Sequence, residues 1–226
     1  IIKEIGLCQM EKEYSICGSG SVIYENKDKK ILYVKQLRHD LFQKLFDFSK
    51  KFDVFPFFVG LEYFYLYKPT QTEIQKREFE HAQYKILPED FNIEELLNGE
   101  DKIMRLVYCK ENDFNYLKSV QKELESVPEF NEVLDIFISS GQYLEINPKG
   151  VNKGVAVQWL LDYLKLEKKQ AMGIGDADND IAMIKNVGFG VAVKNSKEGL
   201  LKIADYVCEK NFDEGAVKEV IDKFLL

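Results

Sequence analysis

The last third of this 226-residue sequence alternates helix-like and strand-like segments, and this alternation restricts the fold more than any other feature. Amphipathic segments at residues 152–166, 178–185, 196–203 and 214–226 are separated by short apolar runs at 170–174, 189–193 and 205–208. Such alternation is typical of a parallel sheet covered by helices, because parallel strands need long crossover connections. The sequence therefore predicts a doubly wound, Rossmann-like α/β sheet in this region.

The preceding part of the chain has a different pattern, without strict alternation. Residues 21–25 and 30–37 are rich in β-formers and flank the turn residues 26–28, which predicts a hairpin. Apolar residues spaced by three and four predict a helix at 40–52. Further strands are expected at 54–67, 103–109, 133–139 and 143–146, and helices around 72–84, 90–97 and 113–124.

This mixture of strands and helices is typical of an α+β domain rather than of a parallel sheet. We therefore expect an α/β core formed by residues 1–37 and 146–226, with an α+β domain, residues 38–145, inserted into it.

The composition of the chain limits the kinds of molecule that it is expected to bind. The net charge is −7, from 31 basic and 38 acidic residues without a basic cluster, which argues against nucleic acid. The most apolar stretch, residues 55–67, is interrupted by Glu62 and is too short to span a membrane. Residues 1–10 lack the pattern of a secretory signal, and the four cysteines are scattered without a CxxC pair. We expect a cytoplasmic monomer or homodimer with a small-molecule partner and no membrane or nucleic-acid partner.

A cluster of polar side chains follows the apolar run at 170–174: Asp176, Asp178, Asn179 and Asp180. Open parallel sheets bind ligands outside the carboxyl ends of their strands, so this place favours a site. A single aspartate here would be explained as a helix cap, but four polar groups together favour a hard cation with oxygen ligands. We interpret the cluster as a Mg²⁺ site, because Mg²⁺ takes one or two carboxylates and keeps water and phosphate oxygens as its other ligands.

Two other motifs are excluded by spacing. An EF-hand calcium loop that used the three aspartates would need Gly at Ile181 and Glu at Val187. A dinucleotide-binding GxGxxG that began at Gly173 and Gly175 would have its third glycine at Asp178, where a carboxylate would repel a pyrophosphate.

A lysine stands at the start of the preceding predicted helix, in the segment GVNKG at residues 150–154. Most lysines are solvated, and Lys153 alone would be interpreted as a surface residue. Backbone N–H groups at the opening of a helix and an ammonium group can together face an anion. Combined with the carboxylate cluster at the next strand-to-helix junction, Lys153 predicts a site for a phosphoryl group and its metal.

These motifs resemble a known family. GVNKG, followed by GIGDADNDIAMIKNVGFGVAVKNS, resembles the third and fourth motifs of haloacid dehalogenase superfamily phosphatases. The resemblance is greatest to the Cof-type sugar-phosphatase branch, which has an α+β cap inserted in its core. ICGSGSVIY resembles the strand and NGA turn that precede the cap, with Ser19 where the family usually has Asn, and DYVCEKNFDEGAVKEVI resembles the family's C-terminal ending. The resemblance thus covers the whole chain.

The resemblance implies the roles of the polar cluster. Asp176 would ligate Mg²⁺, and Asn179 and Asp180 would complete or orient the metal shell. Asp178 falls at a variable position of the motif, and we expect it to cap the following helix.

The resemblance also implies which residues face the phosphate. Lys153 would neutralise the phosphoryl oxygens and the carboxylate of the nucleophile, Asn195 resembles an asparagine near the active site, and Ser19 would contact phosphate with Asn179. The residues expected to take part in catalysis are Lys153, Asp176 and Asp180.

The family's nucleophile is the first aspartate of a DxDGT motif, and no such motif occurs in these 226 residues. The Thr or Ser of the second motif is also missing. Because the sequence begins with Ile1 rather than Met, we expect the first core strand, first helix and second strand to lie upstream. The resemblance implies a Mg²⁺-dependent phosphatase of small phosphorylated metabolites, acting through an aspartyl-phosphate formed on that upstream residue. A chain that binds ligand without turnover, or a sugar phosphomutase, remains an alternative.

Overall fold

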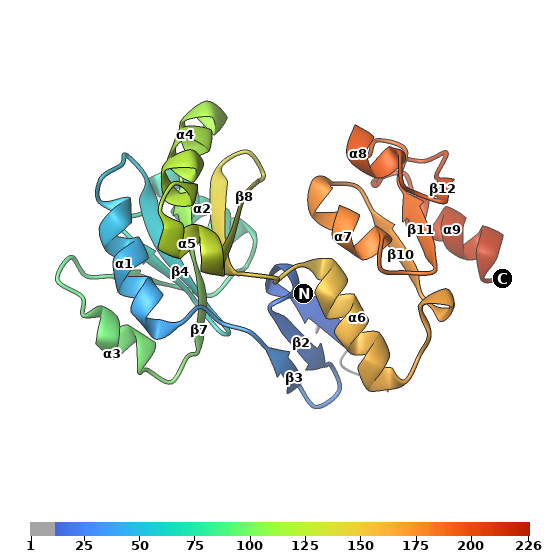
Figure 1. Cartoon of the computed structure of the whole chain (residues 1–226), viewed down its shortest axis with the longest axis horizontal. Coiled ribbons are helices and arrows are strands. Elements are labelled where there is room, and N and C mark those ends of the chain that lie inside the picture. Colours follow the sequence, from blue (N-terminus) through green and yellow to red (C-terminus); the bar gives the residue numbers. More distant parts are fainter. Residues whose placement is uncertain (1–11) are drawn as a thin grey trace. The chain divides into compact units, whose positions relative to one another are not determined.

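The structure, a computed structural model, describes residues 12–226 and divides into two compact units (Figure 1). Unit 1 consists of residues 1–34 and Val151–Leu226, and unit 2 is the intervening segment, Lys35–Gly150. Unit 2 begins at Lys35 rather than at residue 38 and ends at Gly150 rather than at 145. The expectations about residues 1–11, the start of the core and the lack of a secretory pattern, lie outside the described residues.

Within the described residues, unit 1 contains two three-stranded sheets. The antiparallel sheet has the order β1 (Tyr14–Cys17), β2 (Val22–Glu25) and β3 (Lys30–Val34), and β2 and β3 form the predicted hairpin. The second sheet has the order β10 (Met172–Gly175), β11 (Phe189–Ala192) and β12 (Tyr206–Val207). Both of its strand pairs are parallel, as the alternation of helices and strands predicts.

The helices of unit 1 follow the predicted order but are shorter than expected. They are α6 (Lys153–Leu164), α7 (Ile181–Ile184), α8 (Glu198–Leu201) and α9 (Ala216–Phe224). The helix expected at 178–185 is divided into a 3₁₀ turn, η4 (Asp178–Asp180), and α7. Ala216 and Val220 of α9 pack against Val191 and Val193 of the β11 region, which buries one face of the parallel sheet.

Unit 2 is built on one six-stranded sheet in the order β6-β5-β4-β7-β9-β8. Its strands are β4 (Phe55–Gly60), β5 (Phe64–Tyr67), β6 (Tyr84–Leu87), β7 (Ile103–Cys109), β8 (Leu134–Ser139) and β9 (Tyr143–Pro148). The pairs are antiparallel except β5 with β6. This mixture confirms the α+β character predicted for the middle of the chain.

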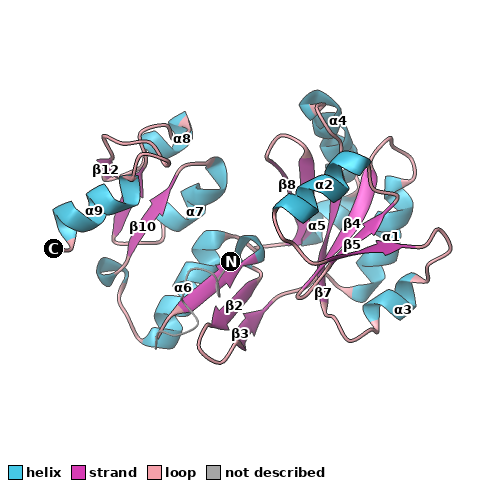
Figure 2. Cartoon of the chain, turned by 180° about the vertical axis from the view of Figure 1, so that it is seen from behind, coloured by secondary structure: helices cyan, strands magenta, loops and turns pink. Residues whose placement is uncertain are grey.

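Helices cover both faces of this sheet, as Figure 2 shows from behind. The helices of unit 2 are α1 (His39–Ser49), α2 (Gln71–Phe79), α3 (Ile93–Leu97), α4 (Phe114–Glu125) and α5 (Pro128–Val133). Buried side chains of α1, α3, α4 and α5 form the larger core with Phe58, Leu106 and Tyr108, whereas α2 lies over the opposite face. Among residues 12–226, no helix is both long and apolar enough to cross a membrane.

Two elements of unit 2 differ from the prediction. The helix expected at 72–84 ends at Phe79, because His81 adopts a left-handed φ of 51°, which an α-helix cannot continue through. The chain after it joins the sheet as β6, parallel to β5. Helix α5 was not predicted, since its six residues are too few to show an amphipathic period.

A buried ion pair lies beneath α2, where the sequence predicts only a polar helix. Glu73 is 1% exposed and Arg77 6%, and Arg77 Nε donates to Glu73 Oε1 at 2.6 Å. The Tyr143 hydroxyl donates to Glu73 Oε2 at 2.8 Å, and the guanidinium lies 4.4 Å from the ring centroid of Phe64. Burial, followed by the bond to Glu73, raises the pKa of Tyr143, which therefore remains a hydrogen-bond donor at neutral pH. These contacts satisfy both buried charges and fix α2 on the sheet.

We predict that Arg77→Met lowers the free energy of unfolding of unit 2 by about 3–5 kcal/mol, because it leaves Glu73 as a buried charge without its counterion. The double variant Glu73→Gln, Arg77→Met should recover more than half of that loss, since the uncompensated charge is gone. Urea unfolding measures both. Lys44→Met, which removes an exposed ion pair with Glu129 in the same unit, should cost less than about 1 kcal/mol. A double variant no more stable than Arg77→Met would contradict this account.

Candidate functional site

The carboxylate cluster forms a tight loop at the carboxyl end of β10. The side chain of Asp180 folds back over this loop, and its Oδ2 accepts hydrogen bonds from the backbone N–H groups of Asp176, at 3.1 Å, and Ala177, at 3.2 Å. A Cβ at Gly175 would lie 2.5 Å from Asp180 Cβ, so only glycine leaves room for this fold-back. Asp180 is buried, while Asp176 is exposed at the surface of the loop.

Lys153 meets this loop from the start of α6. Its Nζ lies 2.5 Å from Asp180 Oδ1, the carboxylate oxygen that the loop amides do not use. Asn152 caps the helix, because its side-chain oxygen accepts from Val155 N at 2.9 Å, and this cap fixes Lys153 as the first helical residue. The Lys153 side chain remains 35% exposed, so part of its ammonium can reach a ligand.

A glycine lets the two helices of the site approach each other. A Cβ at Gly154 would overlap the carbonyl oxygen of Ala182 in α7. Sterics therefore explain why glycine follows the lysine at the start of α6. Gly154 allows α6 to lie against α7, and this position lets Lys153 reach Asp180.

The surroundings of Asp180 keep it ionised. Burial by itself raises the pKa of this carboxyl group, but the hydrogen bonds from Lys153 and from the Asp176 and Ala177 amides outweigh it. The pKa of Asp180 thus lies below its ordinary value of 3.8. Asp180 is therefore a carboxylate at neutral pH and pairs with the Lys153 side chain.

Ser19 lies in a turn next to the start of α6. The turn, η2 (Gly18–Gly20), has left-handed backbone at all three residues, with φ of 58° at Ser19 and 104° at Gly20. A Cβ at Gly20 would overlap the carbonyl oxygen of Asn152, so the turn packs directly against the helix cap. The structure therefore brings Ser19 near the Lys153 end of α6, and its role in phosphate binding stays a prediction.

The loop after β11 also contacts the cluster, through residues that the sequence interpretation missed. Ser196 Oγ donates to the carbonyl oxygen of Gly175 at 3.2 Å, and Lys197 N donates to that of Asp176 at 3.0 Å. Asn195 is exposed, and its Oδ1 accepts from Phe212 N at 3.3 Å. A signal for Ser196 and Lys197 was present, because the carboxyl ends of neighbouring parallel strands meet at one edge of a sheet.

The expectation that Asp178 caps a helix is wrong. Asp178 is the first residue of η4, and the N-cap residues of η4 and α7 are Ala177 and Asp180. The reason is that Asp180 folds back instead and occupies the loop amides of Asp176 and Ala177. Asp178 and Asn179 are exposed beside Asp176.

The oxygen groups of this loop can be compared with the ligands that Mg²⁺ usually takes. In the described range 12–226, no group of three or more His, Cys, Asp or Glu side chains is placed to hold a metal ion. Asp176 nevertheless fits Mg²⁺, which is often held by one or two carboxylates with water and phosphate oxygens in its other positions. Both oxygens of Asp180 already accept hydrogen bonds, so its carboxylate positions Lys153 and the Asp176 backbone.

Comparison with known proteins gives one matching family. The family model described as haloacid dehalogenase-like hydrolase matches residues 1–221. The phosphoglycolate phosphatase of Methanobrevibacter smithii is 39% identical over 113 residues, which cover 49% of this chain and 48% of that protein. The 5-amino-6-(5-phospho-D-ribitylamino)uracil phosphatase of Bacillus subtilis is 37% identical over 90 residues, 40% of this chain and 36% of that protein. The chain thus spans about half or less of the length of these relatives.

Solved structures agree on the fold. A haloacid dehalogenase-like hydrolase from Bacteroides thetaiotaomicron has a TM-score of 0.84 at 22% identity and covers 98% of this chain and 80% of that one. A second, from B. subtilis, has a TM-score of 0.80 at 15% identity and covers 99% of this chain and 82% of that one. At these identities the likeness shows the fold alone, and it confirms a Rossmann-like α/β core with an inserted α+β cap.

We predict that Gly154→Ala lowers the free energy of unfolding by about 1–3 kcal/mol, because the added methyl group forces α6 away from α7. Thermal unfolding measures the loss. Val155→Ala, at the next and exposed position of the same helix, is the matched control and should leave stability nearly unchanged. Equal stability of the two variants would show that α6 and α7 do not need this close contact.

We predict that Asp180→Asn lowers the free energy of unfolding by about 1–3 kcal/mol at neutral pH, because it removes a carboxylate that accepts charge-assisted hydrogen bonds. The folded-state pKa of Asp180 is depressed, so its stabilisation is complete above the unfolded pKa and is lost as pH falls through the folded pKa. The difference in free energy of unfolding between the variant and the wild type should therefore become smaller below about pH 3.8.

Chemical denaturation at a series of pH values, with metal removed by chelation, measures this difference. The exposed Asp178→Asn is the control and should follow the wild-type curve. A difference in free energy of unfolding that stays constant down to the lowest pH measured would contradict the role given to the Asp180 charge.

Proposed function

Because the chain belongs to the haloacid dehalogenase-like hydrolases, we propose that it is a Mg²⁺-dependent phosphatase that releases phosphate from small phosphorylated metabolites. The observation that carries the proposal is the contact of Lys153 with Asp180 in the loop that exposes Asp176. This arrangement places a fixed ammonium and an exposed carboxylate at the carboxyl end of a parallel strand, where such sheets bind ligands. The names of the relatives, a phosphoglycolate phosphatase and a phosphorylated ribitylaminouracil phosphatase, support a phosphoric monoester as substrate.

Lys153 would bind the phosphoryl group. Its Nζ holds one hydrogen bond to Asp180, which leaves donors for phosphoryl oxygens, and the pairing prevents the side chain from turning into solvent. Because the ammonium is already oriented, it can stabilise the charge that develops on the transferred group without a further ordering cost. The start of α6 and the Ser19 turn against it would supply further donors to the same anion.

Asp176 would be the protein ligand of Mg²⁺, with Asn179 beside it on the exposed side of the loop. When bound, Mg²⁺ supplies Lewis-acid stabilisation of the phosphoryl oxygens. Asp180 keeps the Asp176 backbone in place through its Oδ2 and keeps Lys153 in place through its Oδ1. Asn195 would act at the rim of the site, and the inserted unit 2 would select the substrate.

The nucleophile proposed from the family resemblance is the aspartate of a DxDGT motif, which does not occur in these 226 residues. The test therefore uses the product of the complete reading frame. The alternative is a chain that binds metal and phosphate without turnover, and the presence or absence of this motif in the complete reading frame distinguishes the two.

We predict that the complete protein hydrolyses an aryl phosphate in the presence of Mg²⁺ and loses this activity with a chelator. Asp176→Asn should lower kcat by roughly 100-fold or more, comparable to the loss of one main electrostatic contact to a transition state. Asp178→Asn is the matched control, since Asp178 is exposed in the same loop but has no assigned role, and its kcat should stay near the wild-type value.

Full activity of Asp176→Asn would exclude the proposed metal ligand. If the wild type is inactive, calorimetric titration with Mg²⁺ and inorganic phosphate distinguishes the binding-only alternative, in which Asp176→Asn weakens binding of the metal, from a chain without such a site.

A further inference from the structure

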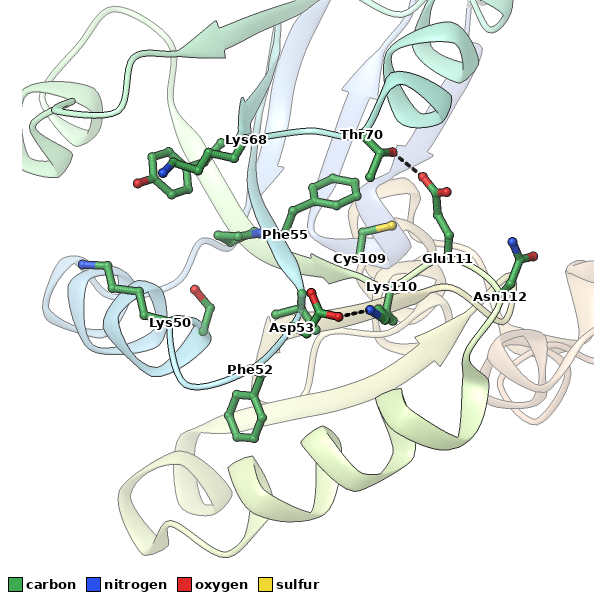
Figure 3. A pocket seen from close by; sticks show the side chains of 14 residues that line it. Lys50, Phe52, Asp53, Phe55, Lys68, Thr70, Cys109, Lys110, Glu111 and Asn112 are labelled. Carbon is green, nitrogen blue, oxygen red and sulfur yellow. Dashed lines mark hydrogen bonds and ion pairs between the residues drawn. The ribbon is translucent and has the colours of Figure 1, made fainter.

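Unit 2 contains a cavity of about 520 Å³ that the proposed phosphatase chemistry does not use (Figure 3). It lies where β4 begins and where β5 and β7 end, between the end of α1 and the start of α2. Every residue that lines it belongs to unit 2, and none belongs to the Lys153 and Asp176 site of unit 1. Its volume is within the range of small-molecule sites, about 300–1,000 Å³.

Aromatic rings form much of the wall. Phe52, Phe55 and Tyr67 line the cavity from the α1 to β4 segment and from the end of β5. Tyr67 is only half-buried, so its ring has area left to contact a ligand, whereas the Phe52 ring points away from Phe55 in Figure 3. Flat apolar walls of this kind favour an aromatic ring, which can stack on them or meet them edge to face.

The acidic groups of the cavity already have partners. Asp53 forms an ion pair with Lys110, and Glu111 accepts a hydrogen bond from the Thr70 hydroxyl, as the dashed lines of Figure 3 mark. The charge of Asp53 is thus offset by a lysine that lines the same cavity. These contacts make the cavity a poor site for a cation.

Two other lysines that line the cavity form ion pairs with acidic residues that do not line it. Lys50 lies 2.7 Å from Asp47, and Lys68 lies 3.2 Å from Glu89; neither acid lines the cavity. These side chains are all more than half exposed, and exposed ion pairs contribute little, so an anion can replace the acids at low cost. Lys50 and Lys68 lie on the same side of the cavity in Figure 3, with Glu111 on the other.

We propose that this cavity is an accessory site for a small aromatic anion, whose ring contacts Phe55 and Tyr67 and whose anionic group binds Lys50 and Lys68. The proposal does not depend on the phosphatase chemistry proposed above, because the cavity shares no residue with the Lys153 and Asp176 site. Binding is noncovalent: burial raises the pKa of Cys109, the thiol of the lining, so that it stays protonated at neutral pH.

The test is a titration of the ¹⁵N-labelled protein, in the presence of chelator, with phenylphosphonate and with benzoate, followed by amide chemical shifts. We expect saturable shifts in residues 50–55, 67–70 and 109–112 with at least one of the two, and their relative affinities show whether the anionic group is a phosphonate or a carboxylate. Benzyl alcohol, which has the ring without the charge, should cause much smaller shifts.

The double variant Lys50→Gln, Lys68→Gln should weaken binding roughly five-fold, and its exposed positions leave the fold intact. Lys118→Gln, an exposed lysine of the same unit that lies over the Phe114 ring and does not line the cavity, is the matched control and should bind as the wild type does. Absence of shifts in these segments, or an unchanged affinity in the double variant, would overturn the proposal. Either result leaves the metal-dependent activity of unit 1 unaffected.

Discussion

The contact between Lys153 and Asp180 joins two parts of unit 1 that lie far apart in the sequence, the start of α6 and the loop after β10. A buried carboxylate must be paired, and here one oxygen takes the lysine while the other takes two loop amides. Asp176 owes its exposed position to this arrangement, since its backbone is fixed by the same carboxylate that fixes the lysine. The groups proposed to bind the metal and the phosphate are therefore positioned by one side chain, Asp180, which need not touch either ligand.

Three glycines make this contact possible, each through a close approach that a Cβ would block. Gly175 leaves room for the fold-back of Asp180, Gly154 lets α6 lie against α7, and Gly20 brings the Ser19 turn onto the helix cap at Asn152. The glycines of the short motifs G-D and K-G are thus required by close packing, whereas the neighbouring Asp and Lys supply the chemical groups. A sequence that kept Lys153 and Asp180 but lost these glycines would retain the charges and lose the geometry.

The sequence predicted the features that depend on local pattern. The hairpin of β2 and β3, the parallel strands β10 to β12 and most helices follow from periodicity and turn residues. Features that depend on backbone angles or distant partners were missed, among them the end of α2, where His81 turns left-handed and the chain joins the sheet as β6. The same limit applies to the site: the sequence predicted that Lys153 and the carboxylates act together. That Asp180, not Asp178, organises the loop depends on which carboxylate can fold back.

Two ion pairs within residues 12–226 show how a structural charge cluster differs from a candidate site. Beneath α2, Arg77 is enclosed by Glu73 and by aromatic rings, and both partners are almost fully buried, so no ligand can reach them. At the end of β10, Asp180 is equally buried, but its partner Lys153 is a third exposed and the adjacent Asp176 is open to solvent. The first cluster uses its charges to fix a helix. The second leaves the Lys153 ammonium and the Asp176 carboxylate able to form further bonds. Groups of this kind, held rigidly at the end of a strand, suit the binding of a phosphate and its metal ion.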